Sequence, residues 1–321
     1  MKTILLALAA TTAIAFSQGP LAPGAAPAPT MKTLAQVEAR TPIPATVTAA
    51  AGPHFTISTP GSYYLTGNIT VTTGDAIAIN TSGVTLDLNG FTLRSTLAGS
   101  ALGKGIDMAE HNRIHVRNGD IVSGTTVSAG DYTLAGFEYG IYVLAGNSRQ
   151  IVVENVSVTG AAVDGINLDQ QGIIDRCSAY RCGARGLEAR IVTGSVARFC
   201  QYGGITAITA ANSEGETKIS KGIDCENATN CTGTSDVGIG LSCVNADNCT
   251  GTSASSPGIS CTNATNSTGI SASSIGLKAT GTASFCRGKG LNVSAIDAAI
   301  AIGCTSSGGP IVSPQKHLGT P

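Results

Sequence analysis

The chain contains an internal repeat that aligns without a gap over three consecutive segments of 18 residues. The segments are GIDCENATNCTGTSDVGI from Gly222, GLSCVNADNCTGTSASSP from Gly240 and GISCTNATNSTGISASSI from Gly258. A fixed period of this length is typical of repeat architectures, in which each unit stacks on its neighbours. Few folds satisfy such a repeat, so it constrains the structure more than any other feature of the sequence.

The phase of the repeat continues outward along pairs of a glycine and an aliphatic residue. The first residue after each glycine is aliphatic, the third is apolar, and the residue between them is mostly polar. This alternation predicts a half-buried strand that recurs once in every coil. The spacing shortens from 35 and 25 residues to 18, so we expect loops on the early coils and few on the later ones. The marker glycines are Gly105, Gly140, Gly165, Gly186, Gly204, Gly222, Gly240, Gly258, Gly276 and Gly290.

A strand of this kind cannot bury its apolar face alone. Stacking each coil on the next at about 4.8 Å pairs the backbones in parallel and creates one continuous interior. We therefore expect an all-β fold, a single-stranded parallel β-helix (solenoid) of about 11 coils, with 18-residue coils in the C-terminal half. A left-handed hexapeptide helix is disfavoured, because aliphatic residues do not recur every six positions.

The turns of the repeat form columns as well. Gly233, Gly251 and Gly269 stand at what we expect to be a corner that requires positive φ. Stacked asparagine amides can hydrogen-bond along the axis of such a rod. Two asparagine columns are expected, Asn227, Asn245 and Asn263 in one and Asn230, Asn248 and Asn266 in the other.

The N-terminus predicts an export signal. Lys2 precedes an apolar run from Ile4 to Ala15, and Ala13-Ile14-Ala15 provides a small-x-small cleavage site. We divide the chain into a signal peptide (1–17), an Ala/Pro/Gly-rich spacer (18–30), an N-terminal cap region (31–60), the β-helix (61–307) and a C-terminal tail (308–321). The expected location is extracellular or at the cell surface, with no membrane span once the signal is removed.

The composition excludes some classes of partner. Lys plus Arg total 19 against 20 Asp plus Glu, so the chain has no excess positive charge with which to neutralise a phosphate backbone. Nucleic acid and anionic membrane surfaces are therefore not expected partners. Charged residues make up only 12% of the chain and glycine is common, with 41 copies, as suits a β-rich solenoid with many tight turns.

Three segments of the first half resemble a known family. They are TISTPGSYYLTGNI (Thr56 to Ile69), VTLDLNGFTL (Val84 to Leu93) and IHVRNG (Ile114 to Gly119). Followed by glycine-aliphatic coils, they are similar to segments of the bacterial secreted proteins with right-handed parallel β-helix repeats, of the pectin-lyase-like fold. The resemblance covers residues 31 to 321 and implies a right-handed coil. It does not specify function, because this fold hosts lyases, hydrolases, adhesins and other surface proteins.

Ten cysteines in a chain with an export signal raise the question of disulfides. Cys225, Cys243 and Cys261 occupy an inward position that alanine, valine or leucine fills in other coils, and Cys231 and Cys249 form a second column. We expect buried thiols here, because small apolar side chains take the same positions elsewhere. Vertical disulfides between stacked coils remain an alternative, since a spacing of about 4.8 Å permits a bridge. A metal site at Cys177, Cys182 and Cys200 is disfavoured, because no pair of histidines accompanies them.

The resemblance implies a search for the chemistry of uronate lyases and polygalacturonases. The lyases bind Ca²⁺ with carboxylates beside a basic residue that removes a proton, and the hydrolases use clustered aspartates. The chain contains no Asp-Asp pair, no Gly-His-Gly and no Arg-Ile-Lys, so the hydrolase pattern is absent.

Polar residues two and four positions after successive marker glycines form the candidate ligand-binding strip. In coils stacked in register they would share one exposed face, where carboxylates beside an arginine can bind a cation or an acidic sugar. The alternative that we favour is a solvated face whose opposite charges fix the register of neighbouring coils. The strip consists of Asn167, Asp169, Glu188, Arg190, Asp224 and Glu226.

Three classes of function follow from these observations. We favour a secreted or cell-surface solenoid that is non-catalytic and binds a polysaccharide or another surface, without a cofactor. A polysaccharide lyase or related carbohydrate-active enzyme is the main alternative, and Ca²⁺ would be its cofactor. Ice binding is the third, because Thr232-Gly-Thr234 and Thr250-Gly-Thr252 stack one coil apart, although the pattern fails at Thr268-Gly-Ile270. The sequence identifies no catalytic residue, and it leaves the metal, the ligand and the oligomeric state open.

Overall fold

The computed structural model describes residues 39–49, 52–144, 146, 149–291 and 294–316. Residues from Arg40 onward form one compact unit, and the description below concerns this unit. The expected signal peptide (1–17), the spacer (18–30) and the first part of the cap region (31–38) lie outside the described residues.

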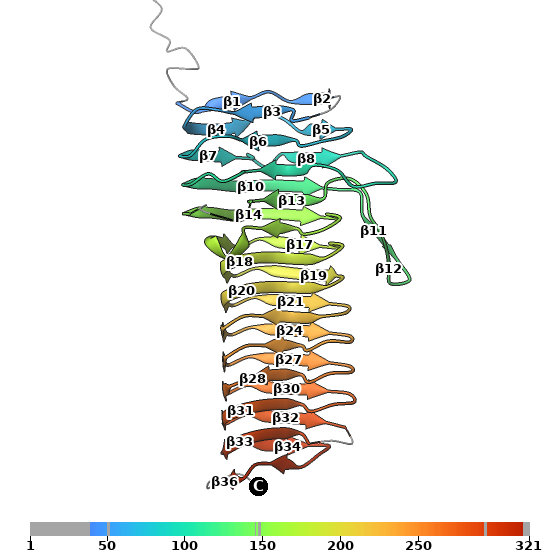
Figure 1. Cartoon of the computed structure of the whole chain (residues 1–321), viewed down its shortest axis with the longest axis vertical. Helices are drawn as coiled ribbons and strands as arrows, with labels where there is room; N and C mark the ends of the chain where they lie inside the picture. The colour runs from blue at the N-terminus through green and yellow to red at the C-terminus, as the bar shows by residue number, and fades with distance from the viewer. Residues whose placement is uncertain (1–38, 50–51, 145, 147–148, 292–293, 317–321) are drawn as a thin grey trace, which may run out of the picture. The chain divides into compact units, whose positions relative to one another are not determined.

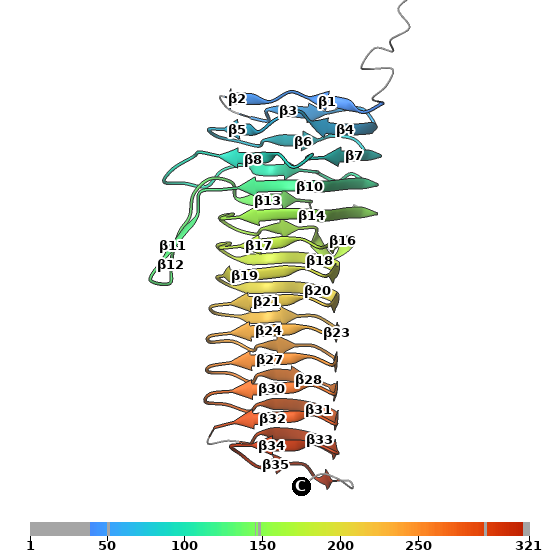
Figure 2. The same cartoon turned by 180° about the vertical axis from the view of Figure 1, so that it is seen from behind.

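The unit is an all-β parallel solenoid of about 14 turns, in which each turn contributes strands to three faces (Figures 1 and 2). The predicted right-handed parallel β-helix is therefore confirmed. Between the two ends of the rod, each strand of the three faces pairs in parallel with the strand one coil before it and the strand one coil after it, so the ladders run along the axis of the rod.

Face 1 is the column that begins with the first strand of the unit. It comprises β1 (Thr41–Ile43), β4 (Gly61–Leu65), β7 (Val84–Asp87), the first halves of β10 (Ile114–Val122) and β14 (Ile151–Thr159), β16 (Gly172–Asp175), the second halves of β18 (Arg185–Thr193) and β20 (Gly203–Ala211), β23 (Asn227–Thr229), β26 (Asn245–Asp247), β29 (Asn263–Thr265), the second halves of β31 (Leu277–Ser284) and β33 (Ile296–Ile302), and β36 (Gln315–Lys316).

Face 2 follows face 1 in each coil. It comprises β2 (Thr46–Ala49), β5 (Ile69–Val71), β8 (Thr92–Ser95), the second halves of β10 and β14, β17 (Ser178–Tyr180), β19 (Val196–Cys200), β21 (Glu214–Thr217), β24 (Thr232–Ser235), β27 (Thr250–Ser253), β30 (Thr268–Ser271), β32 (Arg287–Gly290) and β34 (Thr305–Ser307).

Face 3 contains the glycine-aliphatic strands that the sequence marks. It comprises β3 (Phe55–Ile57), β6 (Ile77–Ile79), β9 (Lys104–Asp107), β13 (Tyr139–Tyr142), β15 (Ile166–Asn167), the first halves of β18 and β20, β22 (Lys221–Asp224), β25 (Leu241–Ser242), β28 (Ile259–Cys261), the first halves of β31 and β33, and β35 (Ile311–Val312).

The core is a set of stacked aliphatic side chains that runs the length of the rod. The residue after each marker position, which is usually glycine, pairs in register with its equivalent in the next coil, from Ile77 and Ile106 to Leu277 and Ile296. These four side chains are fully buried. The expected inward alternation of the face 3 strands is therefore what builds the interior.

The number of coils is larger than the 11 expected from the marker glycines. The first coils carry His54 and Ala76 at the marker position, as the pairing of Phe55 with Ile77 and of Ile77 with Ile106 shows. A search for glycine at the marker position therefore misses these coils. The ladders accordingly include residues 41 to 57 at one end and residues 311 to 316 at the other, outside the range 61–307.

Two details of the predicted repeat are wrong. Gly290 is not a marker, because it ends β32 on face 2, and Ile296 rather than Leu291 pairs with Leu277. Gly233 does not stand at a corner with positive φ, but lies within β24. Its lack of a side chain is needed for close packing, since a Cβ atom there would come within 2.2 Å of the Gly240 carbonyl oxygen.

The corner between faces 1 and 2 is where the backbone turns into the left-handed region. Asparagine suits this conformation because its short polar side chain tolerates positive φ. The two predicted asparagine columns are confirmed by hydrogen bonds along the axis, at 2.9 Å from Asn245 Nδ2 to Asn227 Oδ1 and 2.7 Å from Asn248 Nδ2 to Asn230 Oδ1. The corner residues with φ between 49° and 60° are Asn89, Asn118, Asn155, Arg176, Gly194, Asn212, Asn230, Asn248, Asn266, Phe285 and Gly303.

One insertion leaves the rod, an antiparallel hairpin of β11 (Thr126–Ser128) and β12 (Asp131–Thr133) (Figure 1). It follows β10 and returns to later coils, where the Tyr132 hydroxyl donates to the Phe199 carbonyl oxygen and the Lys218 ammonium donates to the Gly130 carbonyl oxygen. The early loops that the spacing predicts are thus present, and this one is fixed against the body.

Candidate functional site on face 3

The predicted strip divides into two groups in the structure. Asn167, Glu188 and Asp224 lie in one column on face 3, where Asn167 pairs with Glu188 and one further coil separates Glu188 from Asp224. Asp169, Arg190 and Glu226 come after that face instead, toward face 1, with Asp169 in the short 3₁₀ helix η1 (Asp169–Gln171). Arg190 and Glu226 are exposed. The six residues therefore share one side of the rod but do not converge on one point.

The buried part of the strip is organised by Asp164, which sequence reasoning missed. Asp164 is only 1% exposed and accepts hydrogen bonds from Arg185 Nε at 3.3 Å, Arg185 Nη2 at 3.2 Å and Asn167 Nδ2 at 2.8 Å. The backbone N–H of Arg185 donates to the same carboxylate at 2.9 Å. Arg185 Nη1 also contacts Glu188 Oε2 at 2.6 Å. Arg185 thus lies between two largely buried carboxylates on adjacent coils.

The preceding coils place aromatic and charged side chains beside this cluster. The rings of Tyr139 and Tyr142 pack with their centroids 4.4 Å apart, and Lys104 Nζ lies 4.9 Å from the Tyr142 ring centroid. Lys104 Nζ also pairs with Asp107 Oδ2 at 3.0 Å. Tyr142 pairs in register with Asp107 on one side and with Asn167 on the other. The aromatic pair therefore lies between the Lys104–Asp107 ion pair and the cluster around Asp164.

A short sequence pattern explains why these side chains share a surface. In Lys104-Gly-Ile-Asp107, Arg185-Gly-Leu-Glu188 and Lys221-Gly-Ile-Asp224, the two central residues are both buried and the two charged residues form an ion pair. Glycine is required in the centre because a Cβ atom at Gly105 would meet Ile121 Cγ2 at 2.7 Å. The pattern of basic residue, glycine, aliphatic residue and acidic residue is the signal that would have found the site from sequence.

Burial shifts the ionisation of several of these groups. Desolvation raises the pKa of Glu188, opposed by Arg185 and reinforced by Asp164 and Asp169. Desolvation, with the charge of Asp164, also raises the pKa of Tyr139. For Lys104, burial alone would lower the pKa, but the hydrogen bond and charge of Asp107 raise it overall.

The raised pKa of Glu188 has a testable consequence for stability. A carboxyl group whose folded pKa lies above its unfolded value favours folding fully below the unfolded pKa, and this contribution is lost as the pH rises through the folded pKa. Glu188→Gln removes that loss. We therefore expect the melting temperature of Glu188→Gln relative to wild type to rise between about pH 4 and pH 7, as measured by differential scanning fluorimetry. A difference that stays constant or falls over this range would contradict the expected direction.

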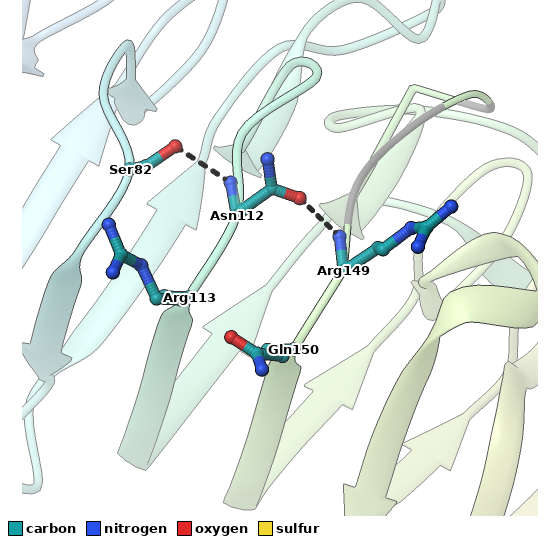
Figure 3. A pocket seen from close by; sticks show the side chains of 5 residues that line it. All are labelled: Ser82, Asn112, Arg113, Arg149 and Gln150. Carbon is teal, nitrogen blue, oxygen red and sulfur yellow. Dashed lines mark hydrogen bonds between the residues drawn. The ribbon is translucent and has the colours of Figure 1, made fainter.

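A separate pocket lies where the chain passes from face 3 to face 1. It has a volume of about 580 Å³ and is lined by Ser82, Asn112, Arg113, Arg149 and Gln150. The backbone N–H of Asn112 donates to Ser82 Oγ at 3.0 Å, and the backbone N–H of Arg149 donates to Asn112 Oδ1 at 2.6 Å. The second bond fixes the Asn112 side chain, and the guanidinium groups of Arg113 and Arg149 lie on either side of it (Figure 3).

Both arginines of this pocket are exposed, and neither forms an ion pair with a described residue. Arg113 immediately precedes β10 and Arg149 lies two residues before β14, and these adjacent strands pair in register. Two unpaired guanidinium groups on neighbouring coils can accept an anionic group.

Two other properties bear on the classes of site. Among the described residues, no group of three or more His, Cys, Asp or Glu side chains is placed to hold a metal ion. Within the same residues, none of the helices is long and apolar enough to cross a membrane.

Comparison with known proteins gives one structural similarity. The chain is similar to the A-module of the mannuronan C-5 epimerase AlgE4 from Azotobacter vinelandii, with 14% sequence identity and a TM-score of 0.47 over 81% of this chain and 82% of that module. No protein-family model matches the chain, and no curated protein matches its sequence.

Proposed function

We propose that the chain is an exported or cell-surface solenoid that binds a polysaccharide along face 3 without changing it chemically. The observation that carries the proposal is the half-buried pair Tyr139 and Tyr142, set between the Lys104–Asp107 and Arg185–Asp164 groups on consecutive coils. Tyrosine offers an apolar ring and a polar hydroxyl, a combination suited to the faces and edges of sugars. Stacked coils extend this surface along the rod, which suits a polymer.

The charge pairing on face 3 supports binding over catalysis. Asp164 and Glu188 both contact Arg185, Lys104 contacts Asp107, and Lys221 Nζ contacts Asp224 Oδ1 at 2.9 Å. A general base must be free to take a proton from the substrate, whereas these carboxylates are already engaged by their cationic partners. Arg113 and Arg149, in the pocket between faces 3 and 1, offer an additional contact for an acidic group on the same polymer.

A polysaccharide lyase is the second candidate. The raised pKa values of Glu188 and Tyr139 favour it, because perturbed ionisation in neighbouring groups is typical of acid–base sites. In that case Ca²⁺ would be sought beside the carboxylates of face 3. Ice binding is less well supported. The two threonine columns of β24 and β27 are in register, but one continues into Ile270 and Lys289, and the other reaches Thr268 and then Arg287.

The test is a binding screen of the purified chain against acidic and neutral polysaccharides, with and without Ca²⁺. We expect Tyr142→Ala to weaken binding about tenfold or more, because truncating a tyrosine at the centre of an interface costs upwards of about 1.4 kcal/mol. Affinity electrophoresis gives the dissociation constants. The matched control is Tyr202→Ala, which removes an exposed tyrosine that follows face 2.

The outcomes separate the candidates. Equal binding by Tyr142→Ala and wild type, with both variants folded, would overturn the assignment of face 3. Formation of unsaturated products, followed by ultraviolet absorbance and abolished by Glu188→Gln, would replace binding by lyase activity. We expect the wild-type chain to bind a polysaccharide without forming unsaturated products.

A further inference from the structure

All ten cysteines of the chain are described, and all are free thiols in inward positions. They fall into columns that run along the axis. The first, the corner column, lies just after the left-handed turn between faces 1 and 2, and its members in chain order are Cys177, Ser195, Ser213, Cys231, Cys249, Ser267, Cys286 and Cys304. The second contains Cys182, Cys200, Thr217, Ser235, Ser253 and Ser271. The third contains Cys225, Cys243 and Cys261.

The corner column has a structural task that serine performs as well as cysteine. Each of its side chains can donate to the carbonyl oxygen two residues earlier, as Ser195 does to Thr193 at 2.7 Å and Cys231 does to Thr229 at 3.2 Å. This bond accounts for a small donor in every coil. It does not account for two cysteines in successive coils at Cys231 and Cys249, and again at Cys286 and Cys304.

The side chains of these successive cysteines occupy the same inward position in adjacent coils, where their thiols interact. For Cys231 and Cys249, and likewise for Cys286 and Cys304, the neighbouring thiol is the largest influence on the pKa. Cys182 is influenced by Cys200 of the second column in the same way. Stacked coils lie about 4.8 Å apart, which is within the Cα separation that a disulfide spans.

The remaining cysteines differ from these three pairs. Cys225, Cys243 and Cys261 share a column, but burial, and not a neighbouring thiol, is the main cause of the raised pKa of each. Cys177 is followed in its column by Ser195. The columns therefore favour pairing of Cys182 with Cys200, of Cys231 with Cys249 and of Cys286 with Cys304.

We propose that Cys182 with Cys200, Cys231 with Cys249, and Cys286 with Cys304 are sites of oxidative cross-linking, each able to form a disulfide that joins two successive coils. Cys177, Cys225, Cys243 and Cys261 stay thiols. The oxidant is a low-molecular-weight disulfide or a thiol oxidase of an oxidising compartment, as an exported chain would meet.

The chemistry of the step follows thiol–disulfide exchange. The thiolate of one cysteine attacks the reagent disulfide, forms a mixed disulfide and releases one reagent thiolate. Its partner then loses its proton, attacks the mixed disulfide at the protein sulfur and releases the second reagent thiolate. Two electrons and two protons pass from the cysteine pair to the reagent, which becomes two thiols.

The experiment is oxidation of the full chain followed by mapping of its cysteines. The chain is refolded with reduced and oxidised glutathione, its free thiols are alkylated, and the digest is examined by mass spectrometry. We expect three linked peptide pairs, four alkylated cysteines of the ten, and a melting temperature about 5 °C or more above that of the reduced chain. Ten alkylated cysteines, or links that join Cys225, Cys243 or Cys261, would overturn the proposal.

A matched pair of variants tests the selectivity. Cys249→Ser is expected to fold, because Ser267 occupies the next position of its column, and to lose only the link to Cys231. Cys243→Ser is the control and is expected to keep all three links. If Cys249→Ser keeps three links, or Cys243→Ser loses one, the assignment of pairs is wrong.

Discussion

Replacing Gly251 by alanine is expected to lower the free energy of unfolding by about 3 kcal/mol, at the upper end of the usual cost of overpacking. A Cβ atom at this position would lie 2.2 Å from the carbonyl oxygen of Gly258 and 2.5 Å from Ile259 Cγ1. The first neighbour is backbone that leads into the face 3 strand of the same turn, and its carbonyl accepts the Leu241 N–H, so it cannot move without breaking a hydrogen bond of the face 3 ladder. The free energy of this steric conflict is therefore lost from the stability of the folded state.

The measurement is thermal or urea-induced unfolding followed by circular dichroism, with Thr252→Ala as the control. Thr252 follows Gly251 in β27 and is only half-buried, so its truncation is expected to change stability by less than about 1 kcal/mol. A loss of 3 kcal/mol corresponds to a fall in melting temperature of at least about 5 °C for a domain of this size. Similar melting of the two variants would show that faces 2 and 3 separate easily at this position.

The same glycine shows what the sequence predicts about the fold and what it does not. The column of Gly233, Gly251 and Gly269 is visible as an 18-residue period, and that period is enough to predict the stacking. The reason for glycine is not visible, because the close approach of face 2 to face 3 across the interior is a property of the folded rod. Glycine satisfies both a positive φ and a close approach, so the sequence alone does not distinguish the two reasons.

The ends of the solenoid were harder to predict for a related reason. His54 and Ala76 occupy the marker position in the first coils, and Ala295 occupies it near the C-terminal end. At the ends of the rod, small or partly exposed residues fit the marker position. Glycine therefore no longer marks each coil, although the strand pairing continues. The inward aliphatic residue persists throughout and is the more reliable guide.

The candidate site was predicted in part. Asn167, Glu188 and Asp224 lie in one column as register implies, but the residues that hold them are one position before the marker glycine. Asp164 and Arg185 occupy that position, where strict alternation would place an inward side chain. The glycine displaces the alternation by one residue, and only the structure reveals that displacement.

Asp164→Ala is expected to destabilise the protein by about 3 kcal/mol, because it leaves Arg185 without the partner that its guanidinium group and backbone N–H both contact. Asp164 is almost fully buried, so its hydrogen bonds are protected from water, and the Asn167 amide loses its acceptor at the same time. Glu188 remains beside Arg185, but one carboxylate cannot replace the contacts of two.

The control is Asp224→Ala, which removes the equivalent ion pair with Lys221 two coils beyond Glu188. The Asp224 side chain is 41% exposed, and an exposed pair contributes about 1 kcal/mol or less. Urea denaturation of the two variants therefore compares a buried pair with an exposed one on the same face. Equal losses would mean that Asp164 is hydrated in solution and that the Arg185 cluster does not hold face 3 in place. A loss at Asp164 alone would show that the surface beside Tyr139 and Tyr142 is preorganised by its buried charges, as a rigid binding face requires.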